Sequence, residues 1–316
     1  MSNINTVDAR TIKKLSATTL NDLARLHAAV YGKQVQPGYF ECKYNTAYTS
    51  VNYIGFIAYD IQLQPIAFYG VIPCFIYCDG ETILSAQSAD TMTHPNHRNK
   101  GLFVELARLT FQLCIQSGIK LLFGFPNQNS LPGFINKLGW QAADRMDCFV
   151  IPVKAFPIQK IGTKFHLFKK LYSWYSNFIL KTHLTSPHAI GSSVLKDGYG
   201  GVLRNEDYLQ SKTYNVTKVI TFNGANIWIK INNDLLIGDM IVSTENFAAT
   251  MQHLIKTAQR LGVNQLQFHT SRGTQLHQLF AARYQPINSF PIIFKDLGNG
   301  LPTGMIKFTF ADIDIF

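Results

Sequence analysis

The chain has 316 residues, of which 47% are hydrophobic and 15% are charged. A polypeptide with this balance folds around a buried core, so the composition excludes an intrinsically disordered protein. The 29 Lys and Arg residues outnumber the 19 Asp and Glu residues, and the net charge of +10 favours an anionic ligand: a phosphorylated cofactor, a nucleic acid or a membrane surface. The length predicts two domains.

Five cysteines are scattered through the first half of the chain, and only Cys74 and Cys78 are close in sequence. No second pair follows at zinc-ligand spacing, so we expect small buried side chains in a reducing cytoplasm and no metal site. The first residues lack a basic region followed by an apolar run, which argues against a signal peptide. The apolar runs are too short for an integral membrane segment.

The sequence of the first half predicts helices and strands, which alternate only toward the end of that half. Leu and Ala at helical spacing predict a helix over 16–31, and the hairpin signal Asp79-Gly80 lies between two runs rich in β-branched and aromatic residues. This order predicts an α/β fold with a mixed sheet and helices on both faces. The other predicted elements are strands at 52–59, 65–77, 81–93, 119–126 and 140–153 and helices at 102–117 and 130–138.

The segment from 154 to 203 differs from its surroundings. Lysines and aromatic residues alternate up to about residue 184, and apolar residues at 165, 168, 172, 175 and 179 predict an amphipathic helix. Two interpretations fit: a helix packed across two domains with solvated lysines, or a helix that lies on a membrane surface or binds nucleic acid. The elements predicted after it are helices at 205–213, 246–261 and 274–283, strands at 217–223, 226–231, 235–242, 264–269 and 286–295, and a strand-like tail at 303–316.

The two halves align without gaps when Gly118 is placed on Gly262. Helix ends, buried strand positions and helix-to-strand corners then coincide, for example Trp140 with Tyr284. This pattern predicts tandem α/β domains at 1–153 and 204–316, each with a central mixed sheet flanked by helices, and joined by 154–203. The alternative is two unrelated α/β domains of similar periodicity.

One loop carries the strongest chemical signal. A strand that ends at Thr93 continues through a basic loop into a helix, and unpaired N–H groups at a helix start favour an anion. Gly101 lets a ligand approach the backbone, while Arg98 and Lys100 add positive charge that suits a pyrophosphate. The alternative for both cations is that they are ordinary solvated loop charges. The corresponding loop of the second half has no glycine and no basic residue, so only the first half can hold this anion.

Here the chain resembles the GCN5-related N-acetyltransferases, the GNAT superfamily. Their signature, Gln/Arg-x-x-Gly-x-Gly/Ala at the start of a helix, is met by Arg-Asn-Lys-Gly-Leu-Phe at 98–103, although Phe103 departs from the final Gly/Ala. Downstream, Phe-Pro-Asn at 125–127 and Gly-Phe-Ile-Asn-Lys-Leu-Gly-Trp at 133–140 resemble the asparagine after the family's fifth strand and its closing Tyr-x-Lys-Leu-Gly-Phe. The resemblance implies a tandem member of the family with a degenerate second copy.

By this resemblance the chain moves an acetyl group from acetyl-CoA to an amine of a small molecule such as an amino sugar or a sugar nucleotide, with no nucleic-acid partner. The backbone at 98–103 would hold the pyrophosphate of acetyl-CoA, and the end of the preceding strand would pair with the pantetheine arm. Asn127 would help to hold that arm, or is only a turn or cap residue. The implied cofactor-binding residues are Met92, Thr93, Arg98, Asn99, Lys100, Gly101, Leu102, Phe103 and Asn127.

Acetyl transfer to an amine needs a base, usually a carboxylate. Asp90 lies on the strand where family members often carry the base, and its alternative role is only to order the loop. The tail, with Asp312 and Asp314 on one face of a strand pattern, offers a second candidate: the carboxylate of Phe316, because some tandem acetyltransferases thread the tail into the first domain's active site. The family's tyrosine acid falls at Ile135, so another acid, or water, must assist the departing thiolate.

Two rival functions remain. The missing tyrosine favours a non-catalytic protein that binds a coenzyme A ester with the same fold. The basic aromatic segment 154–184 favours a protein that binds a membrane or nucleic-acid surface. The oligomeric state stays open.

Overall fold

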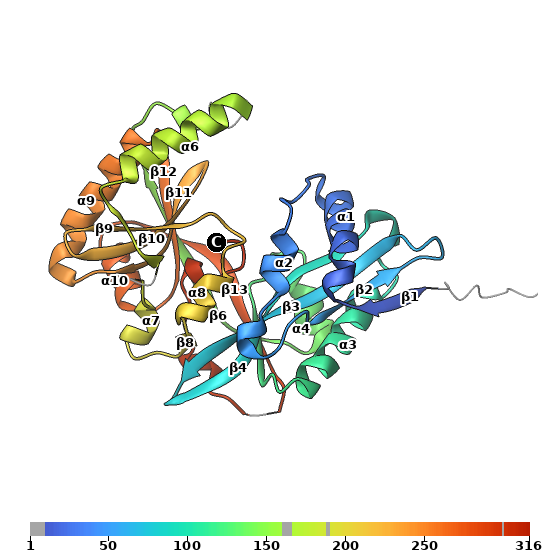
Figure 1. Cartoon of the computed structure of the whole chain (residues 1–316). Coiled ribbons are helices and arrows are strands. Elements are labelled where there is room, and N and C mark those ends of the chain that lie inside the picture. The colour runs from blue at the N-terminus through green and yellow to red at the C-terminus, as the bar shows by residue number, and fades with distance from the viewer. Residues whose placement is uncertain (1–9, 160–165, 188–189, 299) are drawn as a thin grey trace, which may run out of the picture.

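The computed structural model describes residues 10–159, 166–187, 190–298 and 300–316 (Figure 1). Its strands are β1 (Thr11–Lys14), β2 (Gly55–Tyr59), β3 (Pro65–Cys78), β4 (Glu81–Thr93), β5 (Leu121–Gly124), β6 (Gln141–Pro152), β7 (Leu184–Thr185), β8 (Gly201–Val202), β9 (Lys218–Phe222), β10 (Ala225–Asn232), β11 (Asp234–Ile241), β12 (Gln265–Ser271) and β13 (Pro286–Asp296). Its helices are α1 (Leu20–Tyr31), α2 (Tyr39–Tyr44), α3 (Leu102–Gln116), α4 (Leu131–Leu138), α6 (His166–Leu180), α7 (Ser193–Lys196), α8 (Glu206–Ser211), α9 (Thr244–Arg260) and α10 (Gln275–Ala281).

The strands form one mixed sheet that runs through both halves of the chain. Their order is β1-β2-β3-β4-β5-β13-β6-β12-β11-β10-β9-β7, and β8 pairs with β3. The predicted mixed α/β fold, a sheet flanked by helices, is confirmed. The longer predicted elements are also confirmed within a few residues, whereas the sequence did not predict β1 or α2, which have only four and six residues.

Helices cover both faces of the sheet in the first half. Alternating side chains of β2 and β3 separate the two faces: Ala58 packs with α3 and α4, and Ile57 packs with α1 and α2. Two glycines with positive φ bound these helices, because Gly32 ends α1 at φ +67° and Gly101 precedes α3 at φ +78°. This packing fixes the end of β4 between the two helical layers.

The centre of the sheet is built by strands from both halves. β13 lies between β5 and β6, and β6 lies between β13 and β12, and these three pairings are antiparallel. The same order of three strands, helix, strand, helix and strand occurs in β2 to β6 and in β9 to β13. This order is compatible with tandem copies, but the duplication and the boundaries at 153 and 204 stay predictions.

The tail is not a strand, contrary to the sequence-based expectation. It contains two short 3-10 turns, η5 (Thr303–Met305) and η6 (Phe310–Asp312). Thr309 and Asp312 form a capping box, in which the Thr309 N–H donates to Asp312 Oδ2 at 2.8 Å. This turn separates Asp312 from Asp314: Asp312 accepts from Arg204, and Asp314 accepts from Lys43.

The helix predicted within 154–203 is α6, at the rim of the second half (Figure 1). The hydroxyls of Tyr172 and Tyr175 donate to the carbonyls of Leu261 and Arg260 at 3.0 and 2.6 Å, so this face packs on the end of α9. Phe168, expected on the packed face, is 52% exposed. Residue 165, another member of the predicted stripe, is outside the described residues. None of the described helices combines the length and hydropathy that a membrane span requires.

His269 on β12 predicts a pH dependence of stability. Burial lowers the pKa of His269 from 6.5 to about 4, and its ring packs 4.4 Å from Phe310 of η6. Both folded and unfolded chains hold this imidazole neutral above pH 6.5. As the pH falls from 6.5 to 4, only the unfolded chain takes up the proton, so stability decreases, by about 3 kcal/mol when the transition is complete. Urea unfolding at pH 7 and pH 4.5 should show a smaller decrease in His269→Phe than in the unmodified chain; equal decreases would contradict the assignment.

Candidate active site

A bulge in β4 places the candidate base. Phe68 pairs with Met92 and Gly70 pairs with Ala89, so Asp90 and Thr91 together face a single residue of β3. Asp90 has φ +50°, a conformation that non-glycine residues seldom adopt, and bulges of this kind redirect side chains next to active sites. Asp90 thereby leaves the regular alternation of its strand.

The ends of β4 and β5 separate to form the candidate pocket. The two parallel strands pair only from Ser85–Leu121 to Gln87–Phe123. Beyond these pairs, residues 88–93 of β4 and residues 124–127 at and after the end of β5 line a pocket of about 850 Å³, which the start of α3 also lines. A narrow, extended ligand could lie between these two diverging strands. It would bond to the backbone N–H and C=O groups that no longer pair β4 with β5.

The start of α3 presents backbone donors to this pocket. Gly101 is the N-cap with no side-chain cap, and the first intrahelical bonds are those of the Val104 and Glu105 N–H groups to the Gly101 carbonyl, both 3.1 Å. The N–H groups of Leu102 and Phe103 precede these bonds and suit an anion. A Cβ at Gly101 would meet no atom within 4 Å, so the glycine is needed for its positive φ rather than for space.

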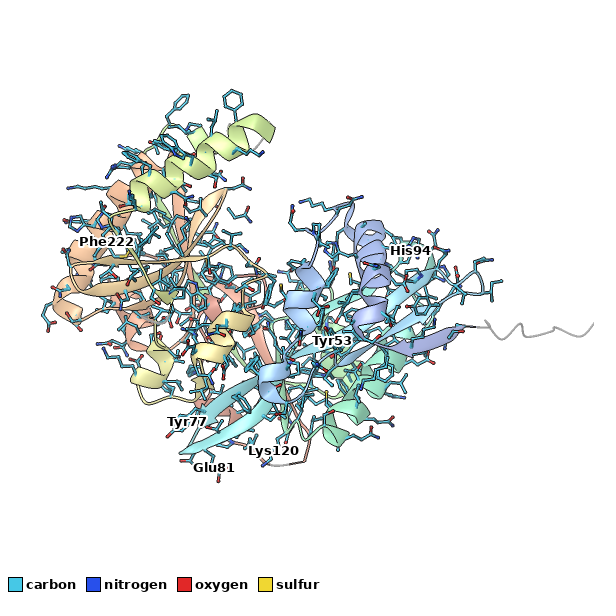
Figure 2. All side chains as sticks on the ribbon, in the orientation of Figure 1. Tyr53, Tyr77, Glu81, His94, Lys120 and Phe222 are labelled. Atoms are coloured by element: carbon cyan, nitrogen blue, oxygen red, sulfur yellow. The ribbon has the colours of Figure 1, made fainter. Side chains whose placement is uncertain are left out.

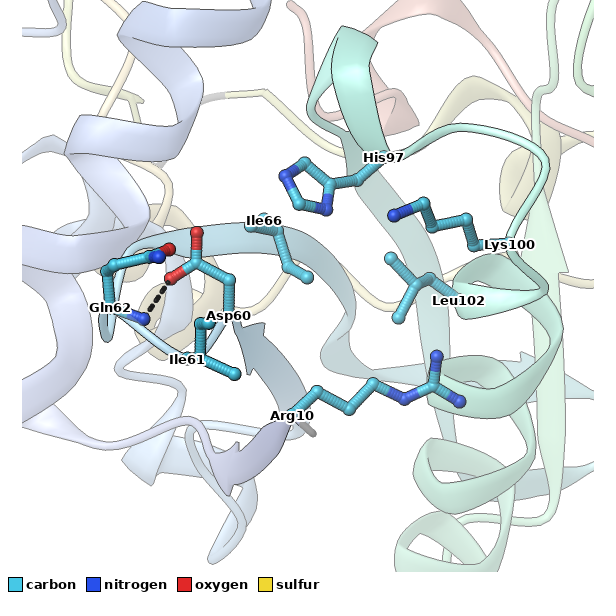
Figure 3. A pocket seen from close by; sticks show the side chains of 8 residues that line it. All are labelled: Arg10, Asp60, Ile61, Gln62, Ile66, His97, Lys100 and Leu102. Atoms are coloured by element: carbon cyan, nitrogen blue, oxygen red, sulfur yellow. Dashed lines mark hydrogen bonds between the residues drawn. The ribbon is translucent and has the colours of Figure 1, made fainter. Parts of the chain in front are cut away.

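Positive charge continues around the start of α3. A smaller pocket of about 220 Å³ lies beside it, and Figure 3 shows the side chains of Arg10, His97 and Lys100 among those that line it. Lys100 lines both this pocket and the larger one. Arg10 also pairs with Glu105 at 2.6 Å, which holds the N-terminal strand against α3. The region therefore suits a ligand with several phosphate charges.

A buried lysine joins two carboxylates from distant parts of the chain. Lys43 Nζ lies 2.7 Å from Asp90 Oδ2 and 2.8 Å from Asp314 Oδ2, and its side chain is 1% exposed. Burial alone would lower the pKa of Lys43, but Asp314 and Asp90 outweigh it and raise this pKa well above 10.5. The Tyr44 hydroxyl donates to Asp90 at 2.9 Å, and Gln87 Nε2 donates to Asp314 at 3.1 Å. The cluster carries two negative charges against one positive charge.

Three side chains of the second half hold the tail that carries Asp314. They donate to three consecutive carbonyls: Lys212 to Ile313 at 2.9 Å, Asn215 to Asp314 at 3.0 Å and Lys230 to Ile315 at 2.7 Å. The second half thus places a carboxylate in the pocket of the first half.

The structure brings together nearly all of the predicted site residues. Asp90 and the nine predicted cofactor-binding residues line the larger pocket. The tail residues that line it are Asp314 and Ile315, whereas the ring of Phe316 is buried 5.6 Å from Trp228. Asn127 Oδ1 accepts from the N–H groups of residues 129 and 130, both at 3.0 Å, so this atom closes a turn. The roles of all these residues stay predictions.

Sequence reasoning missed four groups at the site: Tyr31, Lys43, Tyr44 and Gln87. Tyr31 lines the pocket; burial, followed by the charge of Asp90, raises its pKa and keeps the phenol protonated. Gln87 did not stand out either, because its strand contains many other polar residues. Lys43 belongs to a six-residue helix that no periodicity reveals.

Comparisons with known proteins agree with this geometry. Residues 11–143 match the family model of the acetyltransferase (GNAT) domain. No curated protein is significantly similar to the chain.

Solved structures of similar fold cover most of the chain. A GCN5-related N-acetyltransferase from Kribbella flavida is 12% identical with a TM-score of 0.59, over 92% of this chain and 71% of its own. A probable N-acyltransferase of unknown function from Enterococcus faecalis V583 is 11% identical with a TM-score of 0.60, over 92% and 73%. A putative acetyltransferase from Pyrococcus horikoshii is 10% identical with a TM-score of 0.56, over 95% and 93%.

Proposed function

We propose that the chain transfers an acetyl group from acetyl-CoA to an amine of a small molecule, because residues 11–143 match the family model of the acetyltransferase (GNAT) domain. The observation that carries the proposal is one pocket in which the donors of α3, the separated ends of β4 and β5, and two carboxylates meet. We place the protein in the cytoplasm, where the five free cysteines would stay reduced.

The pocket divides into a cofactor part and an acceptor part. The N–H groups of Leu102 and Phe103, with Arg98 and Lys100, would bind the pyrophosphate, and the pantetheine arm would lie between Met92–Thr93 and Asn127. The thioester would then point toward Asp90 and Asp314. A pocket of about 850 Å³ that also holds pantetheine leaves room for a small acceptor such as an amino sugar rather than a folded protein.

The carboxylates suit an acceptor that arrives as an ammonium ion. Asp90 takes a proton from the ammonium, and the neutral amine attacks the thioester carbonyl carbon. The new C–N bond forms, the C–S bond breaks, and the coenzyme A thiolate takes a proton from Tyr31. The amide nitrogen then gives its second proton to the Tyr31 phenolate, which restores the phenol, and Asp90 releases the first proton to solvent. Tyr31 lines the pocket with a phenol that stays protonated, so it can supply the proton that Ile135 cannot.

Removing both loop cations tests cofactor binding. We expect Arg98→Ala with Lys100→Ala to weaken coenzyme A binding by about tenfold or more, because charge-assisted contacts to the pyrophosphate are lost. Titration calorimetry measures this affinity. Lys196→Ala with Lys256→Ala removes the same charge from exposed positions elsewhere and should leave the affinity unchanged. Equal affinities in both variants would show that the loop does not hold the phosphates.

A non-catalytic coenzyme A ester sensor is the second candidate, favoured by Ile135 at the position of the family's tyrosine. A free-thiol assay with a panel of amines separates the two functions. Turnover supports the enzyme, whereas tight acetyl-CoA binding without thiol release from any amine supports the sensor.

A further inference from the structure

Helix α6 carries a second apolar face that no other described element covers. Its inner face packs on the end of α9 through Tyr172 and Tyr175. Its outer side exposes Leu171, Trp174 and Phe178 by 59%, 69% and 64%. Figure 2 shows ring-bearing side chains that project outward from α6.

The outer residues recur at intervals of three and four, so they form a continuous stripe along the helix. The rings of Trp174 and Phe178 stack on each other with centroids 6.0 Å apart and an angle of 17° between their planes. Exposed apolar surface of this size and continuity indicates an interaction site rather than the scattered exposure of ordinary surfaces.

The sequence segment that carries this stripe has charges of one sign. Residues 148–196 include seven lysines and no Asp or Glu, although the whole chain has 19 acidic residues. The exposed Lys170 and Lys181 belong to α6 and to the position that follows it. A helix with an apolar stripe of Trp, Phe and Leu flanked by lysines is the type that lies in the interface of an anionic bilayer.

We propose that α6 docks the protein on the surface of an anionic phospholipid bilayer, with its outer stripe inserted among the headgroups. A second copy of the chain fits less well, because a two-fold pairing of this face would bring two exclusively basic segments together. A nucleic acid also fits less well: base stacking needs free ring faces along a groove, whereas two of these rings stack on each other at the rim of the molecule (Figure 1). This docking is independent of the proposed acetyl transfer.

Tryptophan fluorescence reports the docking directly. The chain has three tryptophans, and Trp140 and Trp228 are only 2% and 3% exposed. A blue shift of the emission on addition of vesicles therefore reports Trp174. We expect the shift with phosphatidylcholine vesicles that contain phosphatidylglycerol, a much smaller one with phosphatidylcholine alone, and a decrease at high salt.

Vesicle sedimentation separates the apolar and charge contributions. We expect Trp174→Ser with Phe178→Ser to lower the partition coefficient on anionic vesicles by about tenfold or more, because both side chains insert. Lys170→Glu with Lys181→Glu should also weaken binding. Added salt should then lower the partition coefficient of this variant less than it lowers that of the unmodified chain. Val216→Ser with Ile287→Ser removes exposed apolar residues elsewhere, 82% and 53% exposed, and should bind as the unmodified chain does.

Four results would overturn the proposal. They are no binding of the unmodified chain to anionic vesicles at low salt, unchanged binding of the Trp174→Ser, Phe178→Ser variant, a dimer in solution that this variant dissociates, or tight binding to an oligonucleotide in place of vesicles. The third result would assign the stripe to a second copy, and the fourth would assign it to nucleic acid.

Discussion

An Asp90→Asn variant is expected to lose about 10²- to 10⁴-fold in kcat while its affinity for acetyl-CoA stays nearly unchanged. Asparagine keeps the size of the side chain and can still accept from Tyr44, but it cannot take a proton from the acceptor. Asp90 is not among the backbone donors that would bind the pyrophosphate, so cofactor affinity should be spared. A free-thiol assay gives kcat, and titration calorimetry gives the affinity.

Asp314→Asn is the matched comparison, because Asp314 contacts the same Lys43 from the tail. We expect a smaller loss of kcat from this variant, since our proposal gives Asp314 the role of holding the ammonium form of the acceptor and not that of taking its proton. A larger loss from Asp314→Asn than from Asp90→Asn would transfer the role of base to the tail. Full activity in both variants would exclude a carboxylate base at this site.

The loop at 94–101 shows what the sequence could predict. Its information is local: a strand end, two cations, a glycine whose positive φ starts a helix, and an apolar periodicity that continues to residue 116. Each of these features depends on neighbours within a few positions, so the chain order alone places them together. The confirmed α/β fold rests on the same kind of local pattern.

The carboxylate cluster shows what the sequence could not predict. Lys43 and Asp314 are 271 positions apart, and they meet only because β13 inserts between β5 and β6 and brings the tail to the first half. The bulge that turns Asp90 into the pocket leaves no signal either, because strand alternation continues through it in the sequence. Long-range strand order, not local propensity, decides which carboxylates share the pocket.

The outer stripe of α6 shows a different limit. Aromatic residues recur at helical spacing on both faces of this helix, so the sequence pattern alone does not show that one of the two faces is exposed. Periodicity predicted both the helix and its packed face, on which Tyr172 and Tyr175 contact the end of α9 and Ile179 is buried. It did not predict that Phe168, one turn earlier on the same face, would be 52% exposed.

An Arg204→Met variant is expected to lose about 3–5 kcal/mol of stability, the largest loss we foresee from a single substitution. The guanidinium is buried, and its five N–H groups all donate: to Asp312, Asp239, Thr309 and the Gly191 carbonyl. Methionine fills a similar volume but leaves two buried carboxylates without a cation. Urea unfolding followed by circular dichroism measures the loss. Since η6 lies two residues before Asp314, the folded fraction should also lose acetyl transfer.

The cause of that loss can be separated from a packing defect. Adding Asp239→Asn and Asp312→Asn to Arg204→Met removes the two unpaired charges and keeps side-chain oxygens that accept from the N–H groups of Ser193 and Thr309. If buried charge is the cause, this triple variant should be more stable than Arg204→Met alone, because replacing a whole buried ion cluster costs less than breaking it. A triple variant that is less stable than the single one would instead show that the shape of the guanidinium fork, and not its charge, holds the tail beside β11.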